Sequence, residues 1–167
     1  MSVRSAPTCG NQIIADGTRE MQKLLPPTYF LLALVLMTVL HFVVPVYRYW
    51  SLPLSLVGVV PLVFGAALNV TADNAFKKHD TTVKPFERSS ALVTGFPFSL
   101  SRNPMYLGLT LMLVGVALLL GSISSLLPAL VFPYSMRRVF IEEEERMLAA
   151  AFGAEWERYE SAVRRWI

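Results

Sequence analysis

Two groups of residues in this sequence have the types and the spacing to bind a small charged molecule. The first lies in Ser101–Gly108, where a cationic, an amide and a phenolic side chain lead into an apolar run. The second is the run of four glutamates at Glu142–Glu145, which follows another apolar run. Charged side chains are costly near a bilayer, so opposite charges beside apolar runs indicate a functional site.

Arg102 stands just before an expected helix start, because Pro104 suits the first helical turn. Free backbone N–H groups and the helix dipole favour an anion at such a position. Contact with a lipid phosphate is the simpler role for Arg102. A bound zwitterion would instead place its carboxylate at Arg102 and its ammonium near the glutamates, and this is the interpretation we favour.

The glutamate run also has a simpler interpretation, as a solvated helix face. Arg138 and Arg146 lie four residues before and after Glu142, and opposite charges at that spacing pair on a helix. However, adjacent carboxylates repel one another, and only some of these have an arginine at the right spacing. At least one glutamate is therefore expected to face inward, toward a cation.

Other catalytic and metal-binding patterns are not apparent in the sequence. There is no Ser–His–Asp set, P-loop or dinucleotide glycine fingerprint. One cysteine and two histidines are too few for a disulfide framework or a metal centre built from these residues. His41 is expected to be neutral and bonded to a neighbouring helix, with a proton relay as the alternative. Two glycine pairs, each with a spacing of seven residues, predict close helix packing; they are Gly58 with Gly65 and Gly108 with Gly115.

The composition indicates which elements position these residues. Of the 167 residues, 54% are hydrophobic and only 16% are charged, whereas a soluble domain usually has about 25% charged residues. Three runs, residues 26–47, 49–72 and 103–136, contain no Asp, Glu, Lys or Arg. The first two reach the roughly 20 residues that a membrane helix needs. The third has Gly121–Ser122 near its middle, which predicts two shorter helices joined by a tight turn.

The sequence therefore predicts an all-α fold, a polytopic integral membrane helical bundle with about four transmembrane helices. We expect them over about residues 28–47, 52–78, 104–120 and 122–137. Residues 1–27 form a polar N-terminal segment, in which residues 17–25 are expected to make an interfacial helix.

An amphipathic C-terminal helix is expected after the last membrane helix, with Gly153 interrupting it. Its apolar stripe repeats at helical spacing and is expected to lie on the membrane surface or to cap the bundle. The stripe consists of Leu148, Phe152, Trp156, Tyr159 and Val163.

The basic residues predict the orientation in the membrane. All 15 Lys and Arg residues except Arg48 fall in the N-terminal segment, in the connection between the second and third helices, or in the tail. Because cytoplasmic loops carry an excess of basic residues, both termini are predicted to be cytoplasmic. The net charge of +3, without interleaved basic and aromatic repeats, does not indicate a nucleic-acid partner.

Several short motifs, taken in order, resemble the membrane methyltransferases that include isoprenylcysteine carboxyl methyltransferase and the phospholipid methyltransferases. Before the third helix they are Thr82–Pro85, Leu92–Thr94, Pro97–Phe98 and Ser101–Gly108. In the tail they are Glu144–Glu145, Leu148, Phe152–Gly153, Trp156, Tyr159 and Val163. The resemblance covers about residues 55–167 and implies that residues 28–167 form a membrane methyltransferase domain.

The resemblance also implies S-adenosylmethionine as the cofactor and assigns roles to particular residues. The cofactor-binding residues would be Arg102, Asn103, Pro104, Tyr106 and Glu145. Arg138 and Glu144 would be the catalytic residues on the acceptor side, and no metal is expected. Three positions depart from the family pattern: Asn103 replaces a frequent His, Phe96 replaces a frequent Gly, and Trp156 replaces a usual Tyr.

The implied function is methyl transfer from S-adenosylmethionine to a lipidic or hydrophobic acceptor that enters from the bilayer. The acceptor would be isoprenylcysteine carboxylate-like or phospholipid-like. A carboxylate acceptor would need no general base, whereas an amine would lose a proton, which a glutamate accepts. Two other functions stay open at this point, an NADPH-dependent membrane reductase and a non-enzymatic membrane scaffold.

Overall fold

The computed structural model describes residues 25–44, 54–78 and 92–167, and these residues contain helices and no β-strand. The predicted all-α class is therefore confirmed. The interfacial helix expected at residues 17–25 and the Thr82–Pro85 motif lie wholly or almost wholly outside the described residues.

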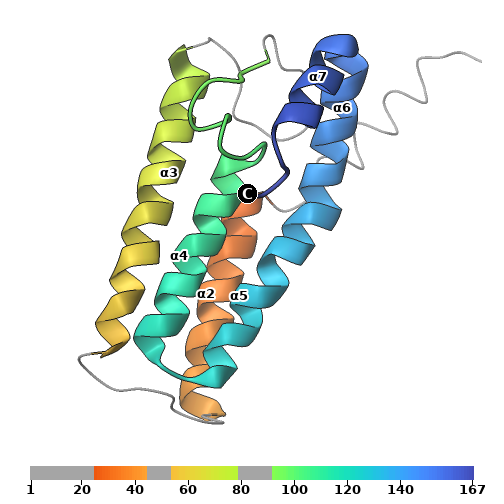
Figure 1. Ribbon diagram of the computed structural model, residues 1–167. Helices are drawn as coiled ribbons and strands as arrows, with labels where there is room; N and C mark the ends of the chain where they lie inside the picture. Colours follow the sequence, from red (N-terminus) through yellow and green to blue (C-terminus); the bar gives the residue numbers. More distant parts are fainter. Residues whose placement is uncertain (1–24, 45–53, 79–91) are drawn as a thin grey trace, which may run out of the picture.

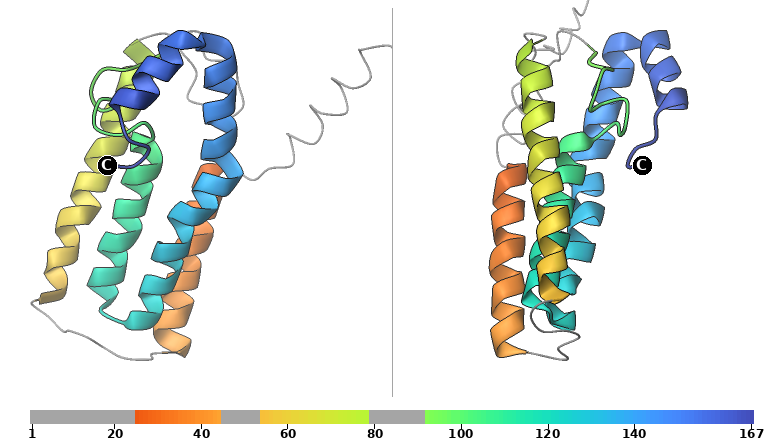
Figure 2. Two further views of the ribbon diagram at one scale, coloured as in Figure 1. Left: turned by 45° about the vertical axis from the view of Figure 1, so that its right-hand side comes forward. Right: turned by 60° about the vertical axis from the view of Figure 1, so that its left-hand side comes forward.

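Long helices lie side by side and form the body of the molecule (Figure 1). They are α2 (Pro26–Val43), α3 (Val59–Lys78), α4 (Pro104–Leu120) and α5 (Ile123–Met136). A 3₁₀ turn, Leu54–Gly58, leads into α3. Successive helices run in opposite directions, so the start of α4 and the end of α5 lie at the same end of the bundle (Figures 1 and 2). We call this the upper end, after its place in Figure 1.

The helix ends follow from local sequence. α2 and α4 both begin at a proline, whose fixed φ suits the first helical turn and whose missing N–H is not needed there. α4 ends at Gly121, which has a φ of 68°, and the chain turns directly into α5. Only glycine adopts this left-handed conformation without strain, so the predicted tight turn is confirmed.

Two segments, Pro26–Val43 and Ser55–Lys78, are long and apolar enough to cross a membrane. α4 is apolar but shorter. Many large apolar side chains of α2 and α3 are exposed on the bundle surface, as expected for helices that face lipid. Examples are Leu31, Val35, Val60 and Phe64. The number of four crossings stays a prediction.

Both glycine pairs lie where α4 packs against α3 and the turn before it. A Cβ atom at Gly65 would overlap the carbonyl oxygen of Gly108, and one at Gly58 would overlap that of Gly115. The two segments therefore approach closely enough for backbone to meet backbone. Packing was the predicted role of these glycines, and it is confirmed.

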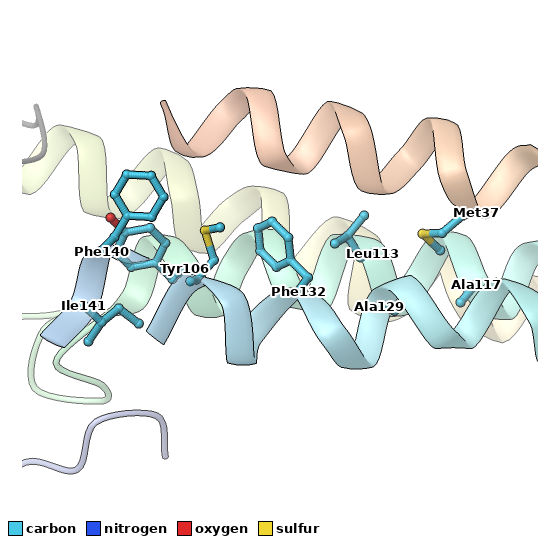
Figure 3. Packing of buried hydrophobic residues seen from close by; sticks show 9 residues of the cluster. Met37, Tyr106, Leu113, Ala117, Ala129, Phe132, Phe140 and Ile141 are labelled. Carbon is cyan, nitrogen blue, oxygen red and sulfur yellow. The ribbon is translucent and has the colours of Figure 1, made fainter. Parts of the chain in front are cut away.

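The main hydrophobic core lies between α2, α4 and α5 (Figure 3). Near its upper end, the Tyr106 ring stacks on the Phe140 ring with centroids 6.2 Å apart, and the edge of Tyr29 meets Phe140 at 5.6 Å. At the opposite end, Nδ1 of buried His41 lies 2.9 Å from Oγ of Ser122, the residue before α5. The predicted bond between His41 and a neighbouring element is therefore present.

The chain leaves α5 through a π-helical segment, Arg137–Ile141, and continues as α6 (Glu142–Phe152). Here the N–H of Glu142 bonds to the carbonyl oxygen of Arg137, five residues back. Such widened turns are rare in proteins, and those that occur often lie at functional sites. Gly153, with a φ of 49°, then separates α6 from α7 (Ala154–Ala162), so the predicted interruption is confirmed.

The amphipathic tail caps the upper end of the bundle. All five residues of its apolar stripe belong to a second hydrophobic cluster, together with Ala72 of α3 and with Val93 and Phe98 of the segment before α4. The hydroxyl of Tyr159 donates a hydrogen bond of 2.8 Å to the carbonyl oxygen of Phe98. The stripe was predicted to lie on the membrane surface or to cap the bundle. In the structure it caps the bundle.

Candidate functional site

The turn before α4 is tied to the C-terminal residues of the chain. The backbone N–H of Arg102 donates to the carbonyl oxygen of Arg164 at 3.0 Å. Ser101 Oγ and Asn103 Nδ2 donate to the carbonyl oxygen of Arg165 at 3.1 and 3.3 Å. The side chain of Asn103 therefore bonds to the C-terminal residues and makes no capping bond to α4.

The Arg102 guanidinium is buried among acidic and aromatic side chains, and only 9% of the side chain is exposed. Its Nη1 donates to Oε1 of Glu160, and its Nη2 lies 3.6 Å from Oε1 of Glu145. Its Cζ lies 5.6 Å from the centroid of the Trp156 ring, within cation–π range. Its Nε is buried and has no hydrogen-bond partner among the described residues. An arginine in this state retains one donor for an acceptor from outside the chain.

Glu145 is the buried member of the glutamate run, with 8% of its surface exposed. Arg165 binds it as a fork: Nε lies 3.0 and 3.1 Å from its two oxygens, and Nη2 lies 2.5 Å from Oε2. This bond raises the pKa of Arg165. The prediction that at least one glutamate faces inward toward a cation is therefore confirmed, although Arg165 was not the expected cation.

Glu144 points to the other side of α6 and meets the first turn of α4. It accepts a hydrogen bond of 2.7 Å from the hydroxyl of Tyr106. Burial raises the pKa of Glu144, and the neighbouring charge of Glu145 acts in the same direction, while the bond from Tyr106 opposes the rise. A carboxyl group with a raised pKa is suited to proton transfer.

Arg138 lies outside this cluster. Its side chain is 58% exposed, its Nη1 lies 3.5 Å from Oε2 of Glu142, and its Cζ lies 5.6 Å from the Tyr134 ring centroid. The predicted pairing with Glu142 is present, and Arg137 adds a second contact of 3.0 Å from its Nε to that carboxylate. Among the described residues, Arg138 has no contact with Arg102, Glu144 or Glu145.

An open pocket of about 370 Å³ lies between α6, α7 and the C-terminal residues. Its wall is mainly charged and also includes one aromatic side chain. The lining residues are Arg137, Glu142, Glu145, Arg146, Ala149, Trp156, Glu160 and Arg165. Arg102 is not among them, although it contacts three of the lining residues, Glu145, Trp156 and Glu160. No group of three or more metal-ligating His, Cys, Asp or Glu side chains occurs in the described part of the chain.

The structure thus brings together most of the residues predicted from the sequence. Arg102 and Asn103, with Pro104 at the first position of α4, form one side, and Glu145 faces Arg102 from α6. Tyr106 and Glu144 form an adjoining pair, whereas Arg138 stays on the outer surface. That these residues bind a cofactor and an acceptor stays a prediction.

Sequence reasoning missed Glu160 and Arg165, which complete the cluster of charges. For Glu160 a signal was present, because it lies four residues after Trp156 and therefore on the same side of the tail helix. For Arg165 there was none, because it follows the end of α7, where helical spacing no longer predicts which side chains meet.

Comparison with known proteins identifies the family. Residues 54–155 match the family described as phospholipid methyltransferase. Over 60 residues the chain is 42% identical to phosphatidyl-N-methylethanolamine N-methyltransferase of Saccharomyces cerevisiae, a match that covers 36% of this chain and 29% of the yeast enzyme. Over 63 residues it is 38% identical to an uncharacterized protein of Haemophilus influenzae, covering 38% of this chain and 100% of that protein. No solved structure matches the chain. Since the family match extends over more than half of its residues, this chain belongs to the phospholipid methyltransferase family.

Proposed function

We propose that this protein transfers a methyl group from S-adenosylmethionine to the headgroup amine of a phospholipid-like acceptor. The observation that carries the proposal is the contact of 3.6 Å between Arg102 and Glu145. It joins the start of a membrane-embedded helix to the helix that leaves the membrane, and it puts a fixed cation and a fixed anion side by side. The family and the printed activity of the yeast relative support a methyl acceptor of the phospholipid class.

The charged groups fit an amino-acid-like donor. S-adenosylmethionine carries a carboxylate, an ammonium and a sulfonium whose methyl group is the electrophile. Arg102 has a buried Nε with no partner among the described residues, which suits a carboxylate, and Glu145 suits a cation. Asn103, Pro104 and Tyr106 belong to the same helix start and would form the wall beside the donor. In such a transfer the protein mainly positions the reactants and excludes water.

Glu144 is the proposed proton acceptor for the amine. A headgroup amine is protonated near neutral pH and attacks only after it loses a proton. Glu144 would take this proton first. The freed lone pair would then form the new N–C bond as the S–C bond breaks with its electrons left on sulfur. The raised pKa of Glu144 supports this role, because a stronger base accepts a proton more readily. A carboxylate acceptor would need no such group, so the buried glutamate favours an amine.

Arg138 is proposed to bind the phosphate of the acceptor. It lies at the exit of α5 next to the exposed ring of Tyr134, in the zone where arginine and tyrosine side chains meet lipid headgroups. The acceptor would reach the site sideways from the bilayer while the donor arrives from the aqueous side. This arrangement requires the upper end of the bundle to face the cytoplasm, with four crossings and both termini on that side.

Titration of the purified protein tests the proposal. S-adenosylhomocysteine is the stable probe of the donor site, and NADPH is the probe of the rival reductase function. Binding of S-adenosylhomocysteine without binding of NADPH is the expected result. Incubation with labelled S-adenosylmethionine and vesicles that contain phosphatidylethanolamine or its N-methyl derivatives should then label the lipid. Binding of NADPH alone, or of neither probe, would contradict the proposal.

A further inference from the structure

The charged groups proposed to hold the donor are already paired with other residues of the chain. Arg165 contacts both oxygens of Glu145, at 2.5 to 3.1 Å. Arg102 donates to Glu160 through Nη1. An arriving ammonium or sulfonium would therefore meet a carboxylate that already has a cation in front of it.

Access to Arg102 is closed in the same way. The open pocket is lined by Glu145, Trp156 and Glu160, and all three contact Arg102, whose Nε is buried. A ligand in the pocket cannot touch the unpartnered Nε of Arg102 unless this wall moves. The pocket and the buried donor atom are thus separated by three side chains, and one of these, Glu145, is held in place by Arg165.

The segment that carries Arg165 lies outside the helices. Residues 163–167 follow the end of α7 and are not helical. Apart from the arginine fork, three hydrogen bonds from residues 101–103 hold the carbonyl oxygens of Arg164 and Arg165. Trp166 packs against the edge of the main core. Release of these five residues breaks no helix, so the segment belongs to the kind of structure that opens locally.

We infer that residues 163–167 form a latch on the donor site, in which Arg165 occupies the position of the ligand's cation at Glu145. This inference rests on the proposed function, since it names the group that donor binding must displace. Binding would exchange one cation for another at Glu145, so the buried carboxylate is never left without a positive partner. With Arg165 displaced, Glu145 becomes free to pair with the cation of the ligand.

Affinity measurements with matched variants test the latch. S-adenosylhomocysteine is titrated into the full-length protein, into Arg165→Gln and into Arg164→Gln. Arg164 is the adjacent, exposed arginine, and its contribution to the site is a backbone carbonyl oxygen. If Arg165 competes with the ligand, Arg165→Gln should bind at least about fivefold more tightly than the wild type, within the usual range of coupling between two ligands. Arg164→Gln should bind like the wild type.

A second measurement needs no variant and therefore stands even if Arg165→Gln does not fold. Trypsin cleaves after Arg164 and Arg165, and mass spectrometry detects the shortened C-terminus. Ligands usually protect a protein from proteolysis. A latch predicts the opposite at this site: saturating S-adenosylhomocysteine should speed cleavage after these two arginines.

The outcomes separate the latch from the function on which it rests. Weaker or unchanged binding by Arg165→Gln, or slower cleavage in the presence of the ligand, would overturn the latch. Because the ligand still binds in those cases, the donor assignment would stand. If neither the wild type nor Arg165→Gln binds S-adenosylhomocysteine, the proposed donor is wrong and the latch is overturned with it.

Discussion

The hydroxyl of Tyr106 donates a hydrogen bond of 2.7 Å to Oε1 of Glu144, and this bond joins the first turn of α4 to the first turn of α6. Burial raises the pKa of Glu144, and the tyrosine bond holds that rise in check, because it favours the charged carboxylate. Burial therefore makes the proposed base stronger, and one hydroxyl group on another helix makes it weaker.

Tyr106→Phe removes that hydroxyl while keeping the ring that stacks on Phe140. The pKa of Glu144 should then rise further, because the opposing hydrogen bond is gone. Since the base acts only when it is deprotonated, the acid limb of the profile of kcat/KM against pH should move to higher pH. Tyr159→Phe makes the same change in the cap, where the hydroxyl bonds to Phe98, and should leave the limb in place. An unmoved limb in Tyr106→Phe would show that Glu144 is not the base.

Glu144→Gln should change how stability depends on pH. In the wild type the folded state binds the Glu144 proton more tightly than the unfolded state, whose pKa is near the ordinary value of 4.5. The free energy of unfolding should therefore fall as pH rises from about that value to the raised pKa, and stay flat above it. Chemical denaturation across this range should show a shallower fall for Glu144→Gln. Glu143→Gln, on the exposed side of α6 beside Arg146, should keep the wild-type slope. An equally steep fall in Glu144→Gln would contradict the raised pKa.

Arg102→Ala and Glu145→Gln should each weaken binding of S-adenosylhomocysteine while the protein stays folded. Loss of one hydrogen bond to a charged group corresponds to a decrease of about tenfold or more. Arg138→Gln serves as the comparison, because Arg138 is exposed and pairs with Glu142 rather than Glu145. It should leave the donor affinity unchanged and raise KM for the lipid acceptor. Unchanged donor affinity in both Arg102→Ala and Glu145→Gln would refute the site.

Gly65→Ala should destabilise the bundle, because the new methyl group would overlap the backbone of Gly108 in α4. Overpacking of this kind costs about 1–3 kcal/mol. Thermal unfolding in detergent should show a lower Tm. Gly95→Ala is the matched control, since nothing lies within 4 Å of a Cβ at that position. A Tm for Gly65→Ala equal to that of the control would mean that α3 and α4 separate at no cost.

Much of the fold could be predicted from the sequence, because its signals are local. Runs without charge predicted the helices, and Pro104 and Gly121 predicted the ends of α4. An apolar stripe at helical spacing predicted the amphipathic tail, with a cap as one of its two possible positions. The proximity of Arg102 to the glutamates followed from placing both at the same membrane edge. None of these inferences depended on which helices pack against one another.

The rest of the site depends on contacts that have no local signal. Arg165 follows the last helix, so no periodicity relates it to Glu145, 20 residues earlier. In the sequence analysis its charge was used only to predict the orientation in the membrane. Arg138 shows the converse: its pairing with Glu142 was predicted correctly, yet its side chain is 58% exposed and does not line the pocket that Glu142 and Glu145 share.

The widened turn at Arg137–Ile141 accommodates one residue more than an ordinary helical turn. Loss of one residue there would restore an ordinary turn and leave the direction of α6 side chains nearly unchanged. Within α6 no such slack exists, so one residue added between Glu142 and Glu144 would rotate the following side chains by about 100°. Glu144 would then turn away from Tyr106, and Glu145 away from the buried arginine. A single-codon deletion in the widened turn should therefore be tolerated better than a single-codon insertion two or three residues later.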